Sequence, residues 1–104
     1  MPITVQRNES HWLIGLEGQI TLTSAAELKE MLLDWLATGK DVELDLERAE
    51  EIDVAIMQLL WSTARQAAGT GARIAGRASS AVAAAVRDSG FARDLGFLLQ
   101  VSRG

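Results

Sequence analysis

Hydrophobic residues alternate with polar ones at the start of the chain, first over 3–7 and again over 12–16. A period of two residues is typical of a β-strand that buries one face. The polar stretch at 8–10 between the two segments has the composition of a turn. Because this connection is short, we predict an antiparallel hairpin whose second strand closes at Gly18.

The pattern then changes to a helical period. Ser24 and Glu27 have the spacing of a capping box, in which each side chain bonds a free amide at the helix start. Gly39 stands where a glycine often ends a helix. We therefore predict a helix between Ser24 and Gly39, with a buried stripe formed by Leu28, Met31, Leu32, Trp35 and Leu36.

A third strand is predicted where Val42, Leu44 and Leu46 alternate with acidic residues. Asp53 then has the character of an N-cap, its carboxylate accepting amide hydrogens from a helix that runs to about Ala68. Gly69 and Gly71 are predicted to end that helix. Its buried stripe is predicted to consist of Ile56, Leu59, Leu60, Thr63, Ala64 and Ala67.

The last third of the chain predicts a short strand at Ala72–Ala75 and a third helix capped by Ser79 or Ser80. This helix buries Val82, Ala83 and Val86 and stops at Ser89–Gly90. One more helical turn is expected at Phe91–Leu95. Phe97–Val101 is hydrophobic enough for an edge strand or a packed tail, and the pattern does not distinguish the two.

Strands and helices alternate from Val42 onward, which requires parallel strands joined by right-handed crossovers. Together with the hairpin, this order predicts an α/β sandwich with a mixed sheet of four to five strands and helices mainly on one face. The 104 residues suit a single domain, 1–104.

Composition and charge argue against several classes of function. The net charge is −4, with twelve acids and four bases in residues 1–53 against two acids and six bases in 54–104. A net acidic chain repels phosphate backbones, so we expect no nucleic-acid binding. The sequence contains no cysteine, no visible signal peptide and no hydrophobic run near the ~18 residues that span a bilayer. We expect no membrane insertion and a cytoplasmic protein.

Catalytic groups are scarce. His11 is the only histidine, and no cysteine accompanies it in a metal site or a triad. Gly69-Thr70-Gly71 resembles the opening of a dinucleotide fingerprint, but Ile74 stands where the third glycine belongs. We therefore expect no enzyme activity, no cofactor and no metal.

Half of the fourteen acids lie between Asp41 and Asp53. Three interpretations remain open for this acidic cluster: a metal or acid–base site, a solvated rim between a strand and a helix, or an edge that docks a protein partner steered by charge. Trp61 lies just beside the stripe of the second helix and is a candidate interface anchor.

The order of the elements, the strand ELDLERAEEID and the helix that follows Asp53 resemble the STAS domain, a family that includes anti-sigma factor antagonists. Short segments also match the family: Gly18-Gln19-Ile20-Thr21 is similar to its Gly-x-Leu-Asp segment, with Thr21 in the aspartate position. Ala25-Ala26-Glu27-Leu28 resembles the start of its first helix. Asp45-Leu46 resembles the end of its central strand, and Ile52-Asp53 the start of its Asp-Ser-Ser/Thr-Gly-Leu motif.

The resemblance raises the question of a switch, because those family members that act as switches are phosphorylated on a serine or threonine two positions after that aspartate. In this chain Val54 follows the aspartate and Ala55 stands at the phosphoacceptor position, so the ordinary phospho-switch has no hydroxyl to use. The resemblance implies a surface for a protein partner, formed by Thr21, Glu50, Glu51, Asp53, Val54, Ala55 and Ile56.

Two functions follow from the resemblance. One is a non-enzymatic interaction module of bacterial signalling, whose partner is an anti-sigma factor of the histidine-kinase type or a chemotaxis protein. The other is a small STAS subunit of a lipid- or anion-transport complex, whose partner is a transporter ATPase.

Overall fold

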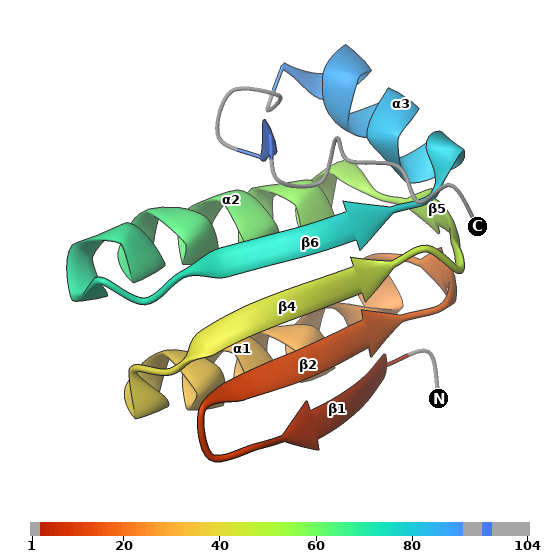
Figure 1. The fold of residues 1–104 in the computed structure, drawn as a ribbon. Helices are drawn as coiled ribbons and strands as arrows, with labels where there is room; N and C mark the ends of the chain where they lie inside the picture. Colours follow the sequence, from red (N-terminus) through yellow and green to blue (C-terminus); the bar gives the residue numbers. More distant parts are fainter. Residues whose placement is uncertain (1–2, 91–94, 97–104) are drawn as a thin grey trace.

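The computed structural model describes residues 3–90, 95 and 96 of the chain. The sequence of elements alternates between strands and helices after an initial hairpin (Figure 1). In chain order they are β1 (Ile3–Arg7), β2 (His11–Leu16), β3 (Gly18–Ile20), the 3-10 turn η1 (Leu22–Ser24), α1 (Ala25–Thr38), β4 (Asp41–Leu46), β5 (Ala49–Ile52), α2 (Val54–Thr70), β6 (Ile74–Ala78) and α3 (Ser80–Ser89).

The main sheet has the strand order β1-β2-β4-β6. The pair β1 and β2 is antiparallel, whereas β2 with β4 and β4 with β6 are parallel. Two short parallel strands, β3 and β5, form a separate small sheet. The predicted α/β class, the hairpin and the mixed sheet of four to five strands are confirmed.

One face of the main sheet is covered by α1 and α2, as Figure 1 shows. The strands β2 and β4 have the same burial pattern, in which every second side chain is buried. Those buried side chains form the core with the helices: Trp12, Ile14 and Leu16 from β2, and Val42, Leu44 and Leu46 from β4. No described helix covers the opposite face, which we call the open face.

The first helix ends as predicted but begins differently. Gly39 has φ 71°, the left-handed conformation of a helix-ending glycine. The predicted capping box at Ser24 is wrong, because the Ser24 side chain makes no capping hydrogen bond. Ser24 is the last residue of η1 and already has a helical backbone, whereas a side-chain cap needs an extended one.

The second helix is longer than predicted. It continues through Gly69 to Thr70, and Gly71, with φ 81°, ends it. Met57 is buried although the predicted stripe omitted it, and the predicted Leu59 and Ala64 are only partly buried. Because α2 lies against α1 as well as against the sheet, its buried surface is broader than one stripe (Figure 1).

The last predicted strand, Ala72–Ala75, is shifted. Pairing with β4 runs from Ile74 opposite Val42 to Ala78 opposite Leu46, so the ladder carries the strand through Gly76. Ser79 caps α3 as predicted, since its hydroxyl accepts from the amide of Val82 at 3.2 Å.

The final predictions concern the C-terminal end of the chain. The segments Phe91–Leu95 and Phe97–Val101 lie outside the described residues except for Leu95, which is buried. In the part of the chain that the structure describes, no helix has the length and hydrophobicity needed to cross a membrane.

Candidate functional site

The small β3–β5 sheet sets the geometry of the predicted partner surface. Its strands are short and lack an alternating pattern, so the sequence did not predict them. Ile20 pairs with Ile52, and both side chains are buried, which fixes this sheet on the core. The residues that follow, Thr21 and Asp53, therefore lie near each other at the carboxyl end of these two parallel strands.

Asp53 connects two segments that are far apart in the sequence. Its amide donates to the carbonyl of Ile20 at 3.1 Å, and its carboxylate Oδ2 accepts from the amide of Leu22 at 2.9 Å. Its carbonyl accepts the first intrahelical bond of α2, from Met57 at 3.1 Å. Asp53 is the N-cap by position, as predicted, but the predicted bond of its carboxylate to the first turn of α2 is wrong.

The three residues after Asp53 differ in exposure. Val54 is 55% exposed, Ala55 is partly exposed and Ile56 is fully buried. The expectation that Ile56 touches a partner is therefore wrong: at the third position of α2 its side chain points into the core. The surface at the start of α2 consists of Val54 and Ala55.

The other predicted residues lie on the surface around that tip. Glu50 and Glu51 are both exposed on β5, between the buried Ala49 and Ile52. Within the described residues neither glutamate forms an ion pair. Thr21 is partly exposed, and its hydroxyl is hydrogen-bonded to that of Thr23 at 2.8 Å.

Leu22 belongs to this surface and was missed by sequence reasoning. Its side chain is 68% exposed, more than that of any other large hydrophobic residue that the structure describes. The bond from its amide to Asp53 holds it beside the start of α2. The signal in the sequence was a leucine between two threonines, just before the predicted helix, where no buried stripe requires it.

The acidic cluster is divided between two places. Its first four acids belong to β4 or follow it, on the open face. Arg77 contacts Glu43 at 3.5 Å and Glu47 at 3.2 Å, although the contact with Glu47 lacks the alignment of a hydrogen bond. Asp45 accepts from the amide of Glu47 at 3.0 Å, and Asp41 from that of Arg73 at 2.9 Å.

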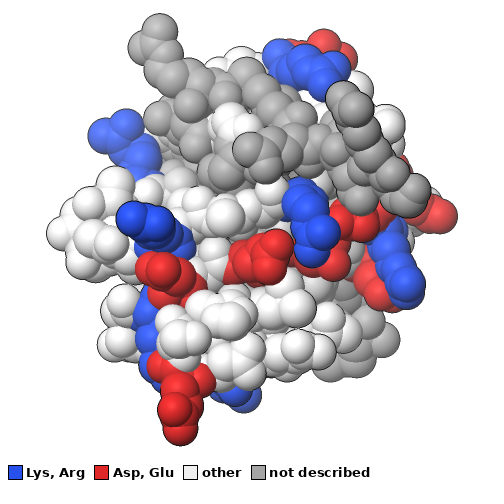
Figure 2. All heavy atoms as spheres, in the orientation of Figure 1, with Lys and Arg blue, Asp and Glu red and all other residues white. Residues whose placement is uncertain are grey.

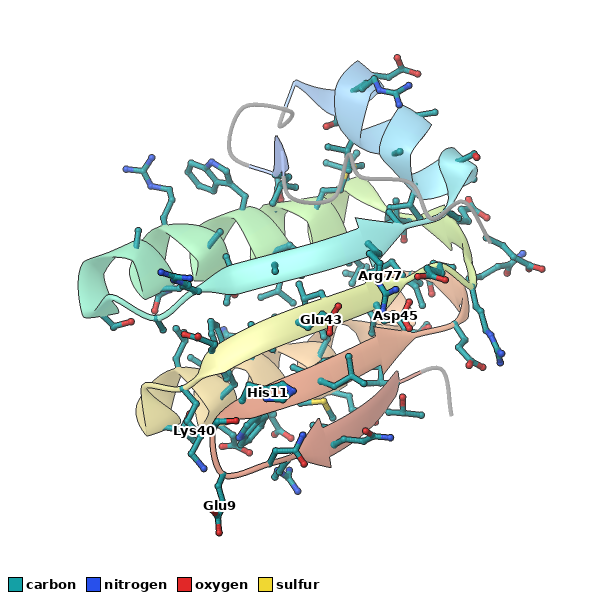
Figure 3. The ribbon with its side chains drawn as sticks, viewed as in Figure 1. Glu9, His11, Lys40, Glu43, Asp45 and Arg77 are labelled. Atoms are coloured by element: carbon teal, nitrogen blue, oxygen red, sulfur yellow. The ribbon has the colours of Figure 1, made fainter. Side chains whose placement is uncertain are left out.

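Acidic and basic side chains consequently lie next to one another across the open face, as Figure 2 shows, and Figure 3 shows Arg77 of β6 close to Glu43 and Asp45 of β4. Within the described residues, no group of three or more acids and histidines is arranged to hold a metal ion. The remaining three acids of the cluster, Glu50, Glu51 and Asp53, belong to the surface at the tip of α2.

His11 lies at the opposite end of the open face from Asp45 (Figure 3). Its Nδ1 is 3.2 Å from the hydroxyl of Ser10, and Asp41 is its partner in the neighbouring strand. In the described part of the chain, however, no carboxylate is hydrogen-bonded to His11, and Asp41 is already bonded to the backbone of Arg73. The three residues therefore lack the oriented base of a catalytic triad.

Two of the three tryptophans, Trp35 and Trp61, have different surroundings. Trp35 is fully buried, as predicted, and its Nε1 donates to the carbonyl of Lys40 at 2.7 Å. Trp61 is partly buried, with the guanidinium of Arg65 5.1 Å from its ring centroid. It lies two turns along α2 from the tip, so it is not part of the surface around Asp53.

Comparison with known proteins identifies relatives of this fold. The family model described as "Mlab, STAS domain" matches residues 3–100. None of the curated proteins with which the sequence was compared matches it. Several solved structures of anti-sigma factor antagonists superimpose on nearly the whole chain.

Three of the solved structures similar to this chain illustrate the likeness. SpoIIAA of Bacillus, in its unphosphorylated form, has a TM-score of 0.79 and 13% identity over 97% of this chain and 89% of its own. An anti-sigma factor antagonist from Mycobacterium paratuberculosis has a TM-score of 0.74 and 17% identity over 88% and 79%. A variant of RsbS from Moorella thermoacetica has a TM-score of 0.74 and 22% identity over 100% and 88%. At these identities the likeness establishes the fold.

Proposed function

This chain belongs to the STAS domain family, and we propose that it is a non-enzymatic, cytoplasmic protein-interaction module of bacterial signalling, similar to the anti-sigma factor antagonists. Its partner is then a protein, an anti-sigma factor of the histidine-kinase type or a chemotaxis protein. The partner docks on the tip surface, which we define as Thr21, Glu50, Glu51, Asp53, Val54 and Ala55.

One observation carries this proposal: Val54 is 55% exposed at the first position of α2. An isolated exposed valine is ordinary on a protein surface. Here, however, it is followed by the partly exposed Ala55, and it comes shortly after Glu50 and Glu51 of β5, which are exposed and form no ion pair among the described residues. A hydrophobic centre with a charged rim is the usual composition of a protein-binding surface.

Ala55 gives the proposed module its particular behaviour. It stands at the phosphoacceptor position of the family and has no hydroxyl, so charge cannot be added at that position. Phosphorylation would bring nearly two negative charges to this surface, and without a hydroxyl at this position the surface stays permanently in its unphosphorylated form. We therefore expect constitutive binding, regulated elsewhere in the pathway.

The test is a substitution that introduces the charge that Ala55 cannot acquire. Ala55→Glu should weaken partner binding in a pull-down from the native host, while the melting temperature stays within a few degrees of the original. Ala68→Glu, at an exposed position near the far end of the same helix, is the matched control and should bind normally. Unfolding of Ala55→Glu, or undiminished binding, would contradict the proposal.

A small STAS subunit of a lipid- or anion-transport complex is the second candidate. The matching family model is described as "Mlab, STAS domain" and does not mention an anti-sigma factor antagonist, so we retain this second candidate. The same pull-down separates the two, because an ATPase or permease partner favours transport and a kinase or anti-sigma factor favours signalling.

A further inference from the structure

Two exposed hydrophobic residues, Leu22 and Val54, lie at or directly beside the tip surface, although they come from different parts of the chain. Among the described residues only Leu22, Leu33 and Val54 are large hydrophobic residues with highly exposed side chains, at 68%, 49% and 55%. Leu33 lies in the second half of α1. Leu22 and Val54 are neighbours because Leu22 is hydrogen-bonded to the residue that precedes Val54.

A hydrogen bond to the carboxylate of Asp53 fixes the position of the Leu22 backbone. The turn η1 that begins at Leu22 spans three residues and has no side-chain cap. Its first amide would be free without the carboxylate of Asp53, which accepts it at 2.9 Å. A carboxylate that accepts a backbone amide forms a stronger bond than a neutral acceptor would. Asp53 thus holds the backbone of Leu22 against the start of α2.

We propose that Leu22 is a second hydrophobic anchor for the partner, close to Val54, and that Asp53 acts as a positioning residue that presents Leu22. This inference rests on the proposed function, since it concerns the same surface. It adds a binding residue and assigns Asp53 a role that its N-cap position does not explain.

The surface also defines the chemistry of the partner. Leu22 and Val54 are aliphatic, and the exposed Glu50 and Glu51 lie on the adjacent strand. The complementary surface is a hydrophobic pocket bordered by lysine or arginine side chains. Such a rim steers association by charge, and the hydrophobic pair supplies the affinity.

The role of Asp53 can be tested without a partner, by amide hydrogen exchange in the isotopically labelled protein. In Asp53→Ala the Leu22 amide should exchange at least about tenfold faster, while the Met57 amide, which is bonded to the Asp53 carbonyl, should change by less than about twofold. Asp53→Asn keeps an acceptor oxygen and should restore protection at Leu22. Equal loss of protection at Leu22 and Met57 would show that Asp53 only stabilises the helix, and would overturn its positioning role.

The role of Leu22 is tested with the purified partner from the pull-down. Leu22→Ser should raise Kd by about ten- to a hundredfold, the effect of removing one buried leucine side chain from an interface. Leu33→Ser, at the other exposed leucine, is the matched control and should leave Kd within about twofold. Asp53→Ala should weaken binding about tenfold, because Leu22 loses the bond that holds it in position. Asp53→Asn should recover most of the affinity, because its amide oxygen can still accept from the Leu22 amide.

The charged rim is tested by salt. Raising the salt concentration from about 50 to 500 mM should slow association of the original protein, and a Glu50→Gln/Glu51→Gln variant should show a flatter dependence. If the association rate of the variant depends on salt as steeply as that of the original protein, the partner has no basic border that faces Glu50 and Glu51.

The outcomes distinguish the inference from the function on which it rests. If Ala55→Glu abolishes binding and Leu22→Ser does not, the tip surface stands and the second anchor is wrong. If neither variant affects binding, or if no partner is recovered, the proposed function fails and the Leu22 anchor fails with it. The exchange experiment decides the positioning role of Asp53 in every case.

Discussion

The two acidic regions of this molecule look alike in sequence and differ in structure. On the open face, acids of β4 meet partners: Arg77 contacts Glu43 and Glu47, and backbone amides bond Asp41 and Asp45. At the tip of α2, the acids Glu50 and Glu51 form no ion pair within the described residues, and exposed hydrophobic side chains accompany them.

This difference indicates which acidic residues are available to bind another molecule. A carboxylate that already bonds its own protein must lose that bond before it can bind another molecule. The acids of β4, together with Glu47, therefore bond to neighbouring parts of the protein and keep the uncovered face of the sheet hydrated. The tip surface retains free charge beside hydrophobic surface, which is the combination that a partner can use.

The largest expected effect separates the tip surface from the core directly beneath it. Ile56→Ala should lower the free energy of unfolding by about 2–5 kcal/mol, because Ile56 is fully buried and its truncation leaves a cavity. Val54→Ala, two residues earlier, should change it by less than about 0.5 kcal/mol. Urea titrations of the two variants provide the measurement. Similar losses in both would mean that Val54 is part of the core, and the tip surface would lose its centre.

The sequence predicted the strands and helices that carry a clear hydrophobic period, and these include α1, α2 and β4. It could not predict β3 and β5, because strands of three and four residues are too short to show a period. The end of β6 was misplaced because Gly76 resembled a stop, whereas pairing with β4 carries the strand through it to Ala78. Ladder bonds to a central strand override such a local signal.

The same reasoning explains which parts of the candidate site were predicted. Asp53 was predicted as an N-cap from a local feature, the start of a helix, whereas Val54 and Ala55 entered the predicted surface through the resemblance to the STAS family. Leu22 was missed because its place depends on a bond across 31 positions of sequence. The burial of Ile56 could be predicted from the sequence. Its position in the pattern put it on the buried stripe of the helix, but it was also assigned to the partner surface, and the structure supports only the first assignment.

The next effect concerns the bond that joins the two halves of the tip surface. Asp53→Ala should cost about 1 kcal/mol of stability, since it removes one hydrogen bond from a charged acceptor at a partly exposed site. Asp53→Asn should cost clearly less, because the amide oxygen still accepts from Leu22. Denaturant titration measures both. A loss of the same size in the two variants would show that the charge, rather than the acceptor, stabilises this region.

A smaller effect tests the packing of the open face. Gly15 lies opposite Thr4 in the β1–β2 hairpin, and a Cβ atom at Gly15 would come within 2.8 Å of the Thr4 hydroxyl. Gly15→Ala should therefore destabilise the protein, and Thr4→Ala should relieve that clash. The double-mutant cycle should give a coupling of about 0.5–1 kcal/mol that favours the double variant. Additive changes would show that the Thr4 side chain turns aside without cost.

The smallest effect tests the contrast between paired and unpaired acids. Arg77→Gln removes both contacts with Glu43 and Glu47, and all three side chains are 30–49% exposed. The loss of stability should be below about 1 kcal/mol at low salt and should shrink further near 1 M salt, where charges are screened beyond about 3 Å. Glu50→Gln/Glu51→Gln should leave stability unchanged at any salt concentration, because these glutamates contact no base among the described residues. Thermal melts at two salt concentrations compare the two variants. If the Glu50/Glu51 variant lost stability in the same salt-dependent way as Arg77→Gln, the acids of the tip would be structural as well, and the distinction between the two regions would be lost.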